Sequence, residues 1–460
     1  MPSEKRLRSD AESIWRAGVA AVDSEQLVRD VVKNTCRELI ICGQRIPLSD
    51  LHRIAVVGAG KAGAGMAAAF EEAVGPQVLE HKLAGWVNVP ADCVRPLQKI
   101  HLHSARPAGV NEPTQTGVEG SLKILEMVSS LGKDDVCVVL ISGGGSALLP
   151  APVPEITLDD KQQVTRFLMQ AGATINELNC VRKKLSRIKG GGLARATGAG
   201  LVLTLIISDV IGDPLDVIAS GPTVADPTTP ADALEILNKY ARRTSDVPPA
   251  VLNFLAQAPC GAPTPIPATV HNDVIGNNVR AMTTAAEHAR GLGYGVHSLG
   301  SENQGEARIV GRELAELCLS VREHSAPIAP PACLLSGGEP VVHVVPTDRP
   351  QKGGRNQELV LAALERFWDS DLREIVLLSG GTDGEDGPTD AAGGIIDADV
   401  LQAARSQRLV PAEYLAVNNS YPFLEQTGGL LKTGPTHTNV MDLRVGLVGN
   451  PDRARVPGFL

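Results

Sequence analysis

The segment Arg53-Ile-Ala-Val-Val57, Gly58-Ala-Gly-Lys-Ala-Gly63 and then Ala64 to Ala73 decides the fold of this 460-residue chain. Its first part is a short apolar run, which predicts a buried strand. The second part is a glycine-rich turn, and the Ala-rich third part predicts a helix. The order strand, glycine turn, helix is the building unit of α/β folds with parallel sheets.

The same order recurs along the chain, which extends the α/β prediction to its whole length. Four further apolar runs are each followed by a polar turn, and most of these turns are rich in glycine. The runs and their turns are Asp135 to Ile141 with Ser142-Gly-Gly-Gly-Ser146, Leu201 to Ile207 with Ser208-Asp209, Ala332 to Leu335 with Ser336-Gly-Gly-Glu339, and Glu374 to Leu378 with Ser379-Gly-Gly-Thr-Asp383. In open parallel sheets ligands bind at the carboxyl ends of the strands. All these turns are therefore candidates to line one cleft.

Composition supports this class and excludes others. Hydrophobic residues make up 43% of the chain but aromatic residues only 3%, so the cores are built from Val, Leu, Ile and Ala. Such cores suit parallel strands buried on both faces and argue against an aromatic platform for single-stranded nucleic acid. The net charge is -9, and the chain contains no basic tail. We expect neither nucleic acid nor an anionic membrane as a partner.

The termini and cysteines predict a cytoplasmic protein. No apolar run approaches the ~18 residues of a membrane-spanning helix, and Met1 to Asp10 lacks an apolar signal core. Arg6 and Arg8 leave import into an organelle open. The eight cysteines are scattered without a C-x-x-C pair, which favours reduced, mostly buried thiols.

The length predicts two domains, because one hydrophobic core rarely serves so long a chain. Residues 222–270 are rich in proline, and this change of composition places a boundary near 245–268. We therefore predict domains at 1–250 and 251–460. Residues 10–40 fit an amphipathic helix. A second helix is predicted from Thr174 to Lys189, with a capping box at its start and glycines after its end.

The first glycine turn matches G-x-G-x-x-G, which alone is a weak signal for a dinucleotide. That pattern needs an acidic residue about 20 positions later, whereas Asp92 follows only after Pro90. Lys61 in the turn instead adds a charge to an anion site, with Gly60 allowing a close approach. A structural turn with an exposed lysine is the alternative.

The run Ser142-Gly143-Gly144-Gly145-Ser146 predicts an anion-binding nest. Its glycines can adopt positive φ and direct successive N–H groups toward one point, while the two serines add hydroxyl groups. A flexible turn is the alternative. The chain lacks the P-loop pattern G-x-x-x-x-G-K-[ST], so a nucleotide site here is of another kind.

Residues 207–229 form the densest group of polar residues after a strand. Asp209 stands at the end of the strand, where a carboxylate suits either Mg²⁺ or the role of general base. Turn capping is the alternative, above all for Asp213. Further candidates for ligand contacts in this region and on the preceding helix are Ser208, Ser220, Gly221, Thr223, Asn179 and Lys183. A solvated basic face is the alternative for Lys183.

The second half offers a separate set of candidates. Gly353-Gly-Arg-Asn-Gln-Glu358 opens a helix predicted from Leu359 to Arg366, so Arg355 lies near a helix N-terminus. Arg355 carries a planar fork suited to a carboxylate or a phosphate, and an exposed structural arginine is the alternative. Asp383 or Asp386, within the acidic run after the last glycine turn, could reach a metal ion. Polar contacts to substrate or nucleotide are also expected from Asn356, Glu358, Thr382 and Thr436.

These motifs together resemble the glycerate kinases whose C-terminal half is the MOFRL domain. The match rests on Gly58 to Ala62, Ser142 to Leu149, Glu177 to Ser186 with Lys189 to Ala194, Ser208 to Pro222, Gly353 to Glu358, Ser379 to Gly384 and Thr433 to Asp442. The chain departs from the family where many members carry G-H-P-x-P-D, because it has Ser104-Ala-Arg-Pro-Ala-Gly-Val-Asn-Glu-Pro113 there.

The resemblance implies a Rossmann-like N-terminal domain and a second α/β domain of MOFRL type, with the active site in the cleft between them. It implies Mg-ATP and D-glycerate, with Lys61 and Arg355 in the active site and the O2 hydroxyl as the favoured acceptor. The alternatives are an NAD(P)H-dependent hydroxypyruvate reductase and a non-catalytic sugar-acid binding protein. Small molecules are the expected partners, and a homodimer is a possible assembly.

Overall fold

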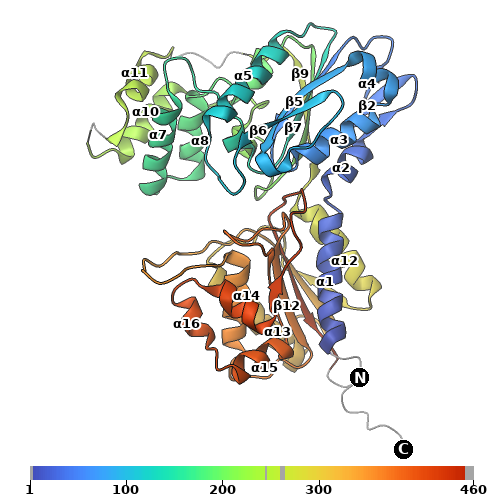
Figure 1. Ribbon diagram of the computed structural model, residues 1–460, viewed down its shortest axis with the longest axis vertical. Helices are drawn as coiled ribbons and strands as arrows, with labels where there is room; N and C mark the ends of the chain where they lie inside the picture. Colours follow the sequence, from blue (N-terminus) through green and yellow to red (C-terminus); the bar gives the residue numbers. More distant parts are fainter. Residues whose placement is uncertain (1–3, 244–245, 260–264, 451–460) are drawn as a thin grey trace, which may run out of the picture. The chain divides into compact units, whose positions relative to one another are not determined.

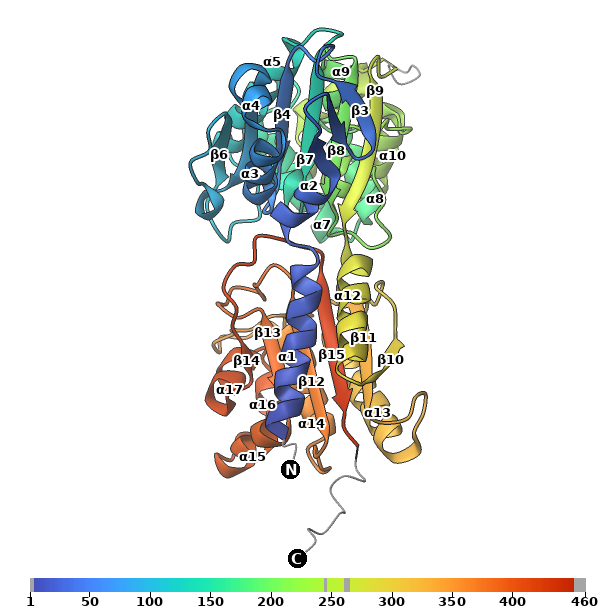
Figure 2. The same cartoon turned by 90° about the vertical axis from the view of Figure 1, so that its right-hand side faces the viewer.

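The computed structural model describes residues 4–243, 246–259 and 265–450, and it divides into two compact units. Unit 1 consists of Met1–Asp23 together with Asn277–Leu460, and unit 2 consists of Ser24–Gly276. Figures 1 and 2 follow the chain through both units by colour. Each unit has its own central sheet and its own apolar core.

Unit 2 is built on a parallel sheet with the strand order β6-β5-β4-β7-β8-β9. When the six strands of this sheet are numbered in chain order, this is the order 3-2-1-4-5-6 of the Rossmann fold. The expected Rossmann-like sheet is therefore confirmed. Its strands are β4 (Ile54–Ala59), β5 (Leu83–Pro90), β6 (Ile100–Arg106), β7 (Val136–Ile141), β8 (Leu201–Ile207) and β9 (Thr269–Gly276).

Helices cover this sheet. Helix α5 (Gln115–Ser129) contributes Ile124 and Val128 to one core cluster with Val57 and Val139 of the sheet. Helices α2 (Ser24–Val31) and α3 (Gly63–Ala73) lie over the face that is turned to the viewer in Figure 2. The shorter elements are α4 (Pro76–Lys82), α6 (Gly145–Leu148), α9 (Gly192–Ala196) and the meander β1 (Val32–Asn34), β2 (Glu38–Ile41) and β3 (Gln44–Pro47).

A group of helices beside the sheet forms a satellite core of its own. It consists of α7 (Leu158–Gln170), α8 (Ile175–Lys184), α10 (Pro230–Tyr240) and α11 (Pro249–Gln257) (Figure 1). Val164, Leu178, Leu237 and Leu255 pack together in it. The proline-rich segment therefore lies within unit 2 rather than between domains.

The division of the chain differs from the predicted boundary at 250/251. After α11 the chain returns to the sheet as β9, which pairs with β8 in parallel and adds the last strand before unit 1 resumes. The first residues also belong to the other unit. Helix α1 (Glu4–Ala20) packs against the sheet of unit 1, because Ile14 and Trp15 share a core cluster with Leu378 and Val445.

Unit 1 contains a mixed sheet with the order β10-β11-β15-β12-β13-β14. Strands β10 and β11 are parallel, and the remaining neighbours are antiparallel. This mixed sheet, with the helices that cover it, confirms the expected second α/β domain. Its strands are β10 (Gly295–Ser298), β11 (Ala332–Gly338), β12 (Ile375–Gly381), β13 (Gly393–Ile396), β14 (Leu430–Leu431) and β15 (Asp442–Val448).

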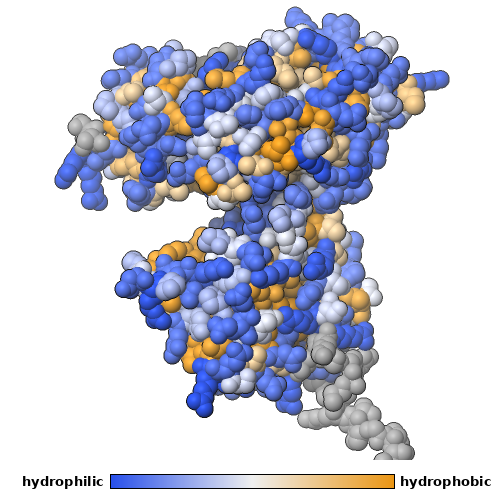
Figure 3. Space-filling view, viewed as in Figure 1, coloured by the Kyte–Doolittle hydropathy of each residue, from blue (hydrophilic) through white to orange (hydrophobic). Residues whose placement is uncertain are grey.

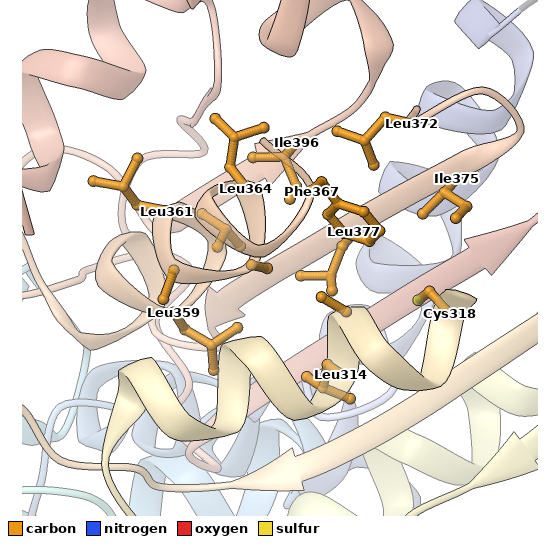
Figure 4. Packing of buried hydrophobic residues seen from close by; sticks show 14 of the residues in the cluster. Leu314, Cys318, Leu359, Leu361, Leu364, Phe367, Leu372, Ile375, Leu377 and Ile396 are labelled. Carbon is orange, nitrogen blue, oxygen red and sulfur yellow. The ribbon is translucent and has the colours of Figure 1, made fainter. Parts of the chain in front are cut away.

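Alternate side chains of these strands enter different cores, as the two-residue period of a strand requires. Leu335 and Leu378 join the cluster of α1 and α12 (Asn278–Gly291). Ile375 and Leu377 join the cluster of α13 (Ala307–His324) and α14 (Arg355–Arg366), which Figure 4 shows from close by. The remaining helices are α15 (Ala398–Ser406), α16 (Pro411–Leu415) and α17 (Ser420–Thr427).

Two helix predictions need correction. Residues 10–40 are not one helix, because the chain turns at Ala21–Asp23, continues as α2 and then enters β1 at the β-branched Val32. The helix predicted to end at Lys189 ends at Lys184, since Leu185 has ψ 16 and Ser186 forms a β-bridge with Pro152. The capping box of Thr174 and Glu177 is confirmed.

The surface and the cysteines are described for the residues that the structure covers. Within the described ranges no helix is both long and apolar enough to cross a membrane. Figure 3 shows polar side chains interspersed with small apolar areas on the visible face of each unit. None of the seven described cysteines forms a disulfide, and Cys137, Cys180, Cys318 and Cys333 are buried. Cys260 lies outside the described residues.

Trp15 tests the assignment of α1 to unit 1. Its side chain is 1% exposed and donates its indole N–H to Gly380 O at 3.3 Å. Trp15→Ala should destabilise unit 1 by about 3–5 kcal/mol, because the mutation leaves a large cavity. Hydrogen exchange should then accelerate in β12 but not in β7. Arg16→Ala, at an exposed neighbour, is the control, and faster exchange confined to β7 would contradict the assignment.

Candidate active site

The turns after β4 and β7 pack directly against each other because the two strands are neighbours in the sheet. Ser142 N donates to Ala59 O at 3.1 Å, and Lys61 N donates to Gly143 O at 2.9 Å. Ala62 N donates to Ser142 Oγ at 3.0 Å. A Cβ at Gly60 would lie 1.9 Å from the same Oγ, so only glycine allows this approach.

The two turns differ in which N–H groups they leave available. In the first turn, Gly60 N donates to Asn88 O and Gly63 N donates to Gly60 O, in addition to the bonds of Lys61 and Ala62. In the second turn, the N–H groups of Gly143 and Gly144 donate to no acceptor among the described residues. Gly144 has φ +77, the left-handed conformation expected of a nest.

Two cationic side chains border this second turn. A Cβ at Gly144 would lie 3.1 Å from Arg106 Nη2 and 3.9 Å from Lys61 Cγ. Arg106 is the last residue of β6, and its Nη1 donates to Asn111 Oδ1 at 2.7 Å and also to Val110 O. The sequence analysis missed Arg106, although it lies in the segment that departs from the family pattern.

Ser146 links the second turn to the basic segment at the end of α8. Its Oγ accepts from Arg182 Nη2 at 2.6 Å and from Lys189 Nζ at 2.9 Å. Its hydroxyl lies 3.0 Å from Ser220 Oγ, which donates to Asn179 Oδ1 at 3.1 Å. Asn179, Ser146 and Ser220 are therefore brought together as candidates, while Arg182 and Lys189 were missed.

Backbone strain marks the segment that carries Ser220. Ala219, Ser220 and Gly221 adopt positive φ values of 50, 62 and 61°. Non-glycine residues take this conformation rarely, and such strain concentrates at functional sites. Gly145 belongs to the same contact, because a Cβ on it would lie 3.1 Å from the Cβ of Ala219.

Thr223 and Ser208 are buried candidates of unit 2, whereas Asp209 is partly buried. Thr223 Oγ1 donates to Asn272 Oδ1 at 2.6 Å and accepts from Thr204 Oγ1 within the core. Ser208 is fully buried, and its Oγ interacts with Val210. Asp209 is the next residue after Ser208, close to the end of β8, and is partly buried.

The positive charge of Lys183 is compensated within unit 2. Its Nζ lies 3.3 Å from Asp216 Oδ2 and 3.7 Å from Asp226 Oδ1. Lys184 forms a further ion pair with Asp226 at 2.7 Å. A phosphate would have to compete with these carboxylates for Lys183, which favours a structural role over the predicted phosphate contact.

In unit 1, Arg355, the first residue of α14, forms a bidentate ion pair. Its Nε and Nη2 donate to Asp442 Oδ2 and Oδ1 at 2.8 and 2.9 Å, and its Nη1 lies 2.9 Å from Glu339 Oε1. Burial opposes the charge of Arg355, but Asp442 outweighs it and raises the pKa of the guanidinium. Burial also raises the pKa of Glu339, although Arg355 opposes that shift.

Three further candidates of unit 1 stabilise the structure around this pair. Asn356 and Ser379 are hydrogen-bonded, and Asp386 Oδ1 accepts from Asn356 N at 3.0 Å at the start of α14. Burial raises the pKa of Asp386 to about 7. Glu358 accepts from Arg308 at 2.7 Å and from Asn418 at 2.9 Å.

Asp383 lies in the turn after β12 with Thr382 and Thr436. Thr436 donates its N–H to Asp383 O and its hydroxyl to Thr382 O, and Thr382 Oγ1 itself bonds to Met441 O at 2.7 Å. No group of three His, Cys, Asp or Glu residues in the described part of the chain could hold a metal ion. Mg²⁺ that is bound through phosphate oxygens needs only one or two carboxylates, so Asp209 and Asp383 stay predictions for such a site.

The two carboxylates on Arg355 should differ in their effect on stability. Asp442 is fully buried, so Asp442→Asn leaves Arg355 without its main counter-charge and should cost about 3 kcal/mol. Glu339 has a 45% exposed side chain, so Glu339→Gln should cost less than about 1 kcal/mol. Thermal unfolding of both variants measures the difference, and equal losses would contradict the dominance of the buried pair.

A Rossmann-like unit with two glycine-rich turns, inserted into a second α/β unit, defines the class of this protein. Residues 10–256 match the family described as "Domain of unknown function (DUF4147)", and residues 332–442 match the MOFRL family. The chain is 37% identical over 405 residues to the D-glycerate 2-kinase of Thermotoga maritima, covering 88% of this chain and 93% of that protein.

A crystal structure of glycerate kinase from Thermotoga maritima superposes with a TM-score of 0.82 at 35% identity, covering 96% of this chain and all of that chain. A "putative hydroxypyruvate reductase" of Agrobacterium vitis is 41% identical over 407 residues, with 88% of this chain and 89% of that protein covered. The chain belongs to this MOFRL-containing glycerate kinase family, which confirms the resemblance found in the sequence.

Proposed function

We propose that this chain is a glycerate kinase that uses ATP to phosphorylate D-glycerate, with O2 as the acceptor and 2-phosphoglycerate as the product. Membership of the glycerate kinase family supports the reaction class. The name of the Thermotoga maritima relative, D-glycerate 2-kinase, supports the O2 hydroxyl.

The observation that carries the proposal is the second glycine turn. Its Gly143 and Gly144 amides have no acceptor among the described residues, and Lys61 and Arg106 lie beside it. Amides and cations directed at one point form a site for phosphate oxygens. We assign the triphosphate of ATP to Ser142–Ser146, with Ser208 and Asp209 at the end of the adjacent strand β8.

The remaining roles follow from the needs of phosphoryl transfer, which are positioning and charge stabilisation. Lys61 and Arg355 supply positive charge to the glycerate carboxylate and to the transferred phosphoryl group. The pair with Asp442 orients Arg355 and still leaves N–H donors on both of its terminal nitrogens. Asp209 is the first choice for general base or metal ligand, and Asp383 is the second. When bound, Mg²⁺ would neutralise phosphate charge.

The reductase is the main rival because one relative carries that name. A dinucleotide needs free amides in the first glycine turn to bind its pyrophosphate. All four amides from Gly60 to Gly63 are engaged within the protein, and this weighs against the reductase. A sugar-acid binding protein without activity would bind glycerate but form no product. A cytoplasmic location and a homodimer remain predictions.

The deciding experiment supplies D-glycerate with either Mg-ATP or NAD. We expect ADP release and no reduced cofactor, and ³¹P–¹H NMR of the product should place the phosphate on C2. Release of NADH without ADP would replace the kinase by the reductase. Binding of glycerate with no product in either mixture would leave only the binding protein.

Lys61 should contribute directly to the rate. Lys61→Ala should lower kcat about a hundredfold, because loss of one transition-state charge contact costs about 3 kcal/mol. Lys123→Ala removes an exposed lysine of the same unit, which pairs with Glu126, and should leave kcat unchanged. Near-normal turnover of the Lys61 variant would remove Lys61 from the mechanism.

A further inference from the structure

Three cationic side chains converge behind Ser146 in unit 2. Lys161 belongs to α7, Arg182 to α8, and Lys189 follows α8. Lys161 is 7% exposed and Lys189 only 2% exposed, while Arg182 is partly buried. We call these three residues the cation cluster.

The cation cluster has no acidic partner among the described residues, since none of its members forms an ion pair there. Within the described ranges, Arg182 and Lys189 donate only to neutral oxygens. Both donate to the Oγ of Ser146, Lys189 also donates to the carbonyl of Ser146, and Arg182 makes a weaker contact with Asn179. The Nζ of Lys161 is buried and has no hydrogen-bond acceptor at all within the described structure.

The members of the cluster oppose one another's charge. Burial, followed by the charge of Arg182, lowers the pKa of Lys161 to about 7. Burial and then Arg182 and Lys161 lower the pKa of Lys189 well below its usual value. The neighbouring Lys183 and Lys184 differ, because Asp216 and Asp226 compensate them.

A buried cation without a counter-charge is costly, so proteins pair such groups or use them to bind anions. Among the described residues, Arg182 and Lys189 share one hydroxyl, that of Ser146, which ends the glycine turn. Gly144, Ser146 and Arg182 are partly exposed, so the cluster can be approached from this side. Lys161 and Lys189 lie deeper.

We propose that Lys161, Arg182 and Lys189 bind a phosphoryl oxyanion beside Ser146. A phosphoryl group carries up to about two negative charges and three acceptor oxygens, which suits three converging cations better than a single carboxylate does. This inference deepens the proposed function and rests on it in one respect, the molecule that carries the phosphoryl group. That molecule is either the nucleotide, with its polyphosphate, or the phosphorylated product.

The test compares matched arginine variants. Arg182→Gln removes a cluster member, and Arg187→Gln removes an exposed arginine three residues beyond the end of α8. Titration calorimetry with pyrophosphate, ADP and 2-phosphoglycerate measures the affinity of each protein. Pyrophosphate should bind Arg182→Gln at least about tenfold more weakly than wild type, whereas Arg187→Gln should stay within about twofold.

Lys161→Met adds a readout that a merely structural lysine would not give. Replacing an uncompensated buried cation by an apolar side chain of similar length should raise Tm without ligand. The same variant should show a smaller rise of Tm on adding pyrophosphate than wild type does. A lower Tm without ligand would overturn the proposal, as would equal pyrophosphate affinity of the Arg182 and Arg187 variants.

The ADP and 2-phosphoglycerate titrations distinguish the source of the phosphoryl group. Selective loss of ADP affinity in Arg182→Gln assigns the cluster to the nucleotide, and selective loss of 2-phosphoglycerate affinity assigns it to the product. Pyrophosphate binding needs no turnover. A protein that fails to phosphorylate glycerate but still shows the Arg182-dependent binding would therefore refute the proposed function and retain the anion site.

Discussion

The contact between the turns after β4 and β7 is the constraint on which the rest of unit 2 depends. Two strands that are neighbours in a parallel sheet bring their carboxyl ends within hydrogen-bonding distance, and Gly60 leaves room for Ser142. The amides of the first turn thereby donate to acceptors within the protein. Those of Gly143 and Gly144 in the second turn have no acceptor among the described residues. The proposed anion site therefore lies at the second turn and not at the turn that resembles a dinucleotide fingerprint.

The two units differ in the partners of their cationic side chains. In unit 1, Arg355 is held by a buried bidentate pair with Asp442, and a second carboxylate, Glu339, lies at its outer nitrogen. Around Ser146 in unit 2, cations gather against neutral oxygens. A compensated arginine is held in a fixed orientation for its remaining N–H donors, whereas uncompensated cations favour negative ligands strongly. The paired arginine of unit 1 is therefore suited to holding one orientation, and the cations around Ser146 in unit 2 are suited to attracting an anion.

The sequence predicted the strands of the parallel sheet and their glycine turns well, because an unbroken apolar run followed by glycine has few other interpretations. It predicted Arg355 at a helix start and the capping box of Thr174. It could not select Arg182 and Lys189 over Lys183, since all lie in one basic segment and only packing against Asp216 and Asp226 separates them. Prolines likewise suggested a boundary that β9, by pairing with β8, moves further along the chain.

Helix α1 lies at the start of the chain and yet contributes Ile14 and Trp15 to the core of unit 1. The whole of unit 2 is thus inserted into unit 1 after Asp23. During synthesis, unit 2 can complete its sheet from contiguous sequence. The apolar face of α1 stays uncovered until β12 and β15 have left the ribosome. Until then that face is available to chaperones or to other nascent chains, so the covalent order of the segments makes unit 1 the later and more aggregation-prone half to mature.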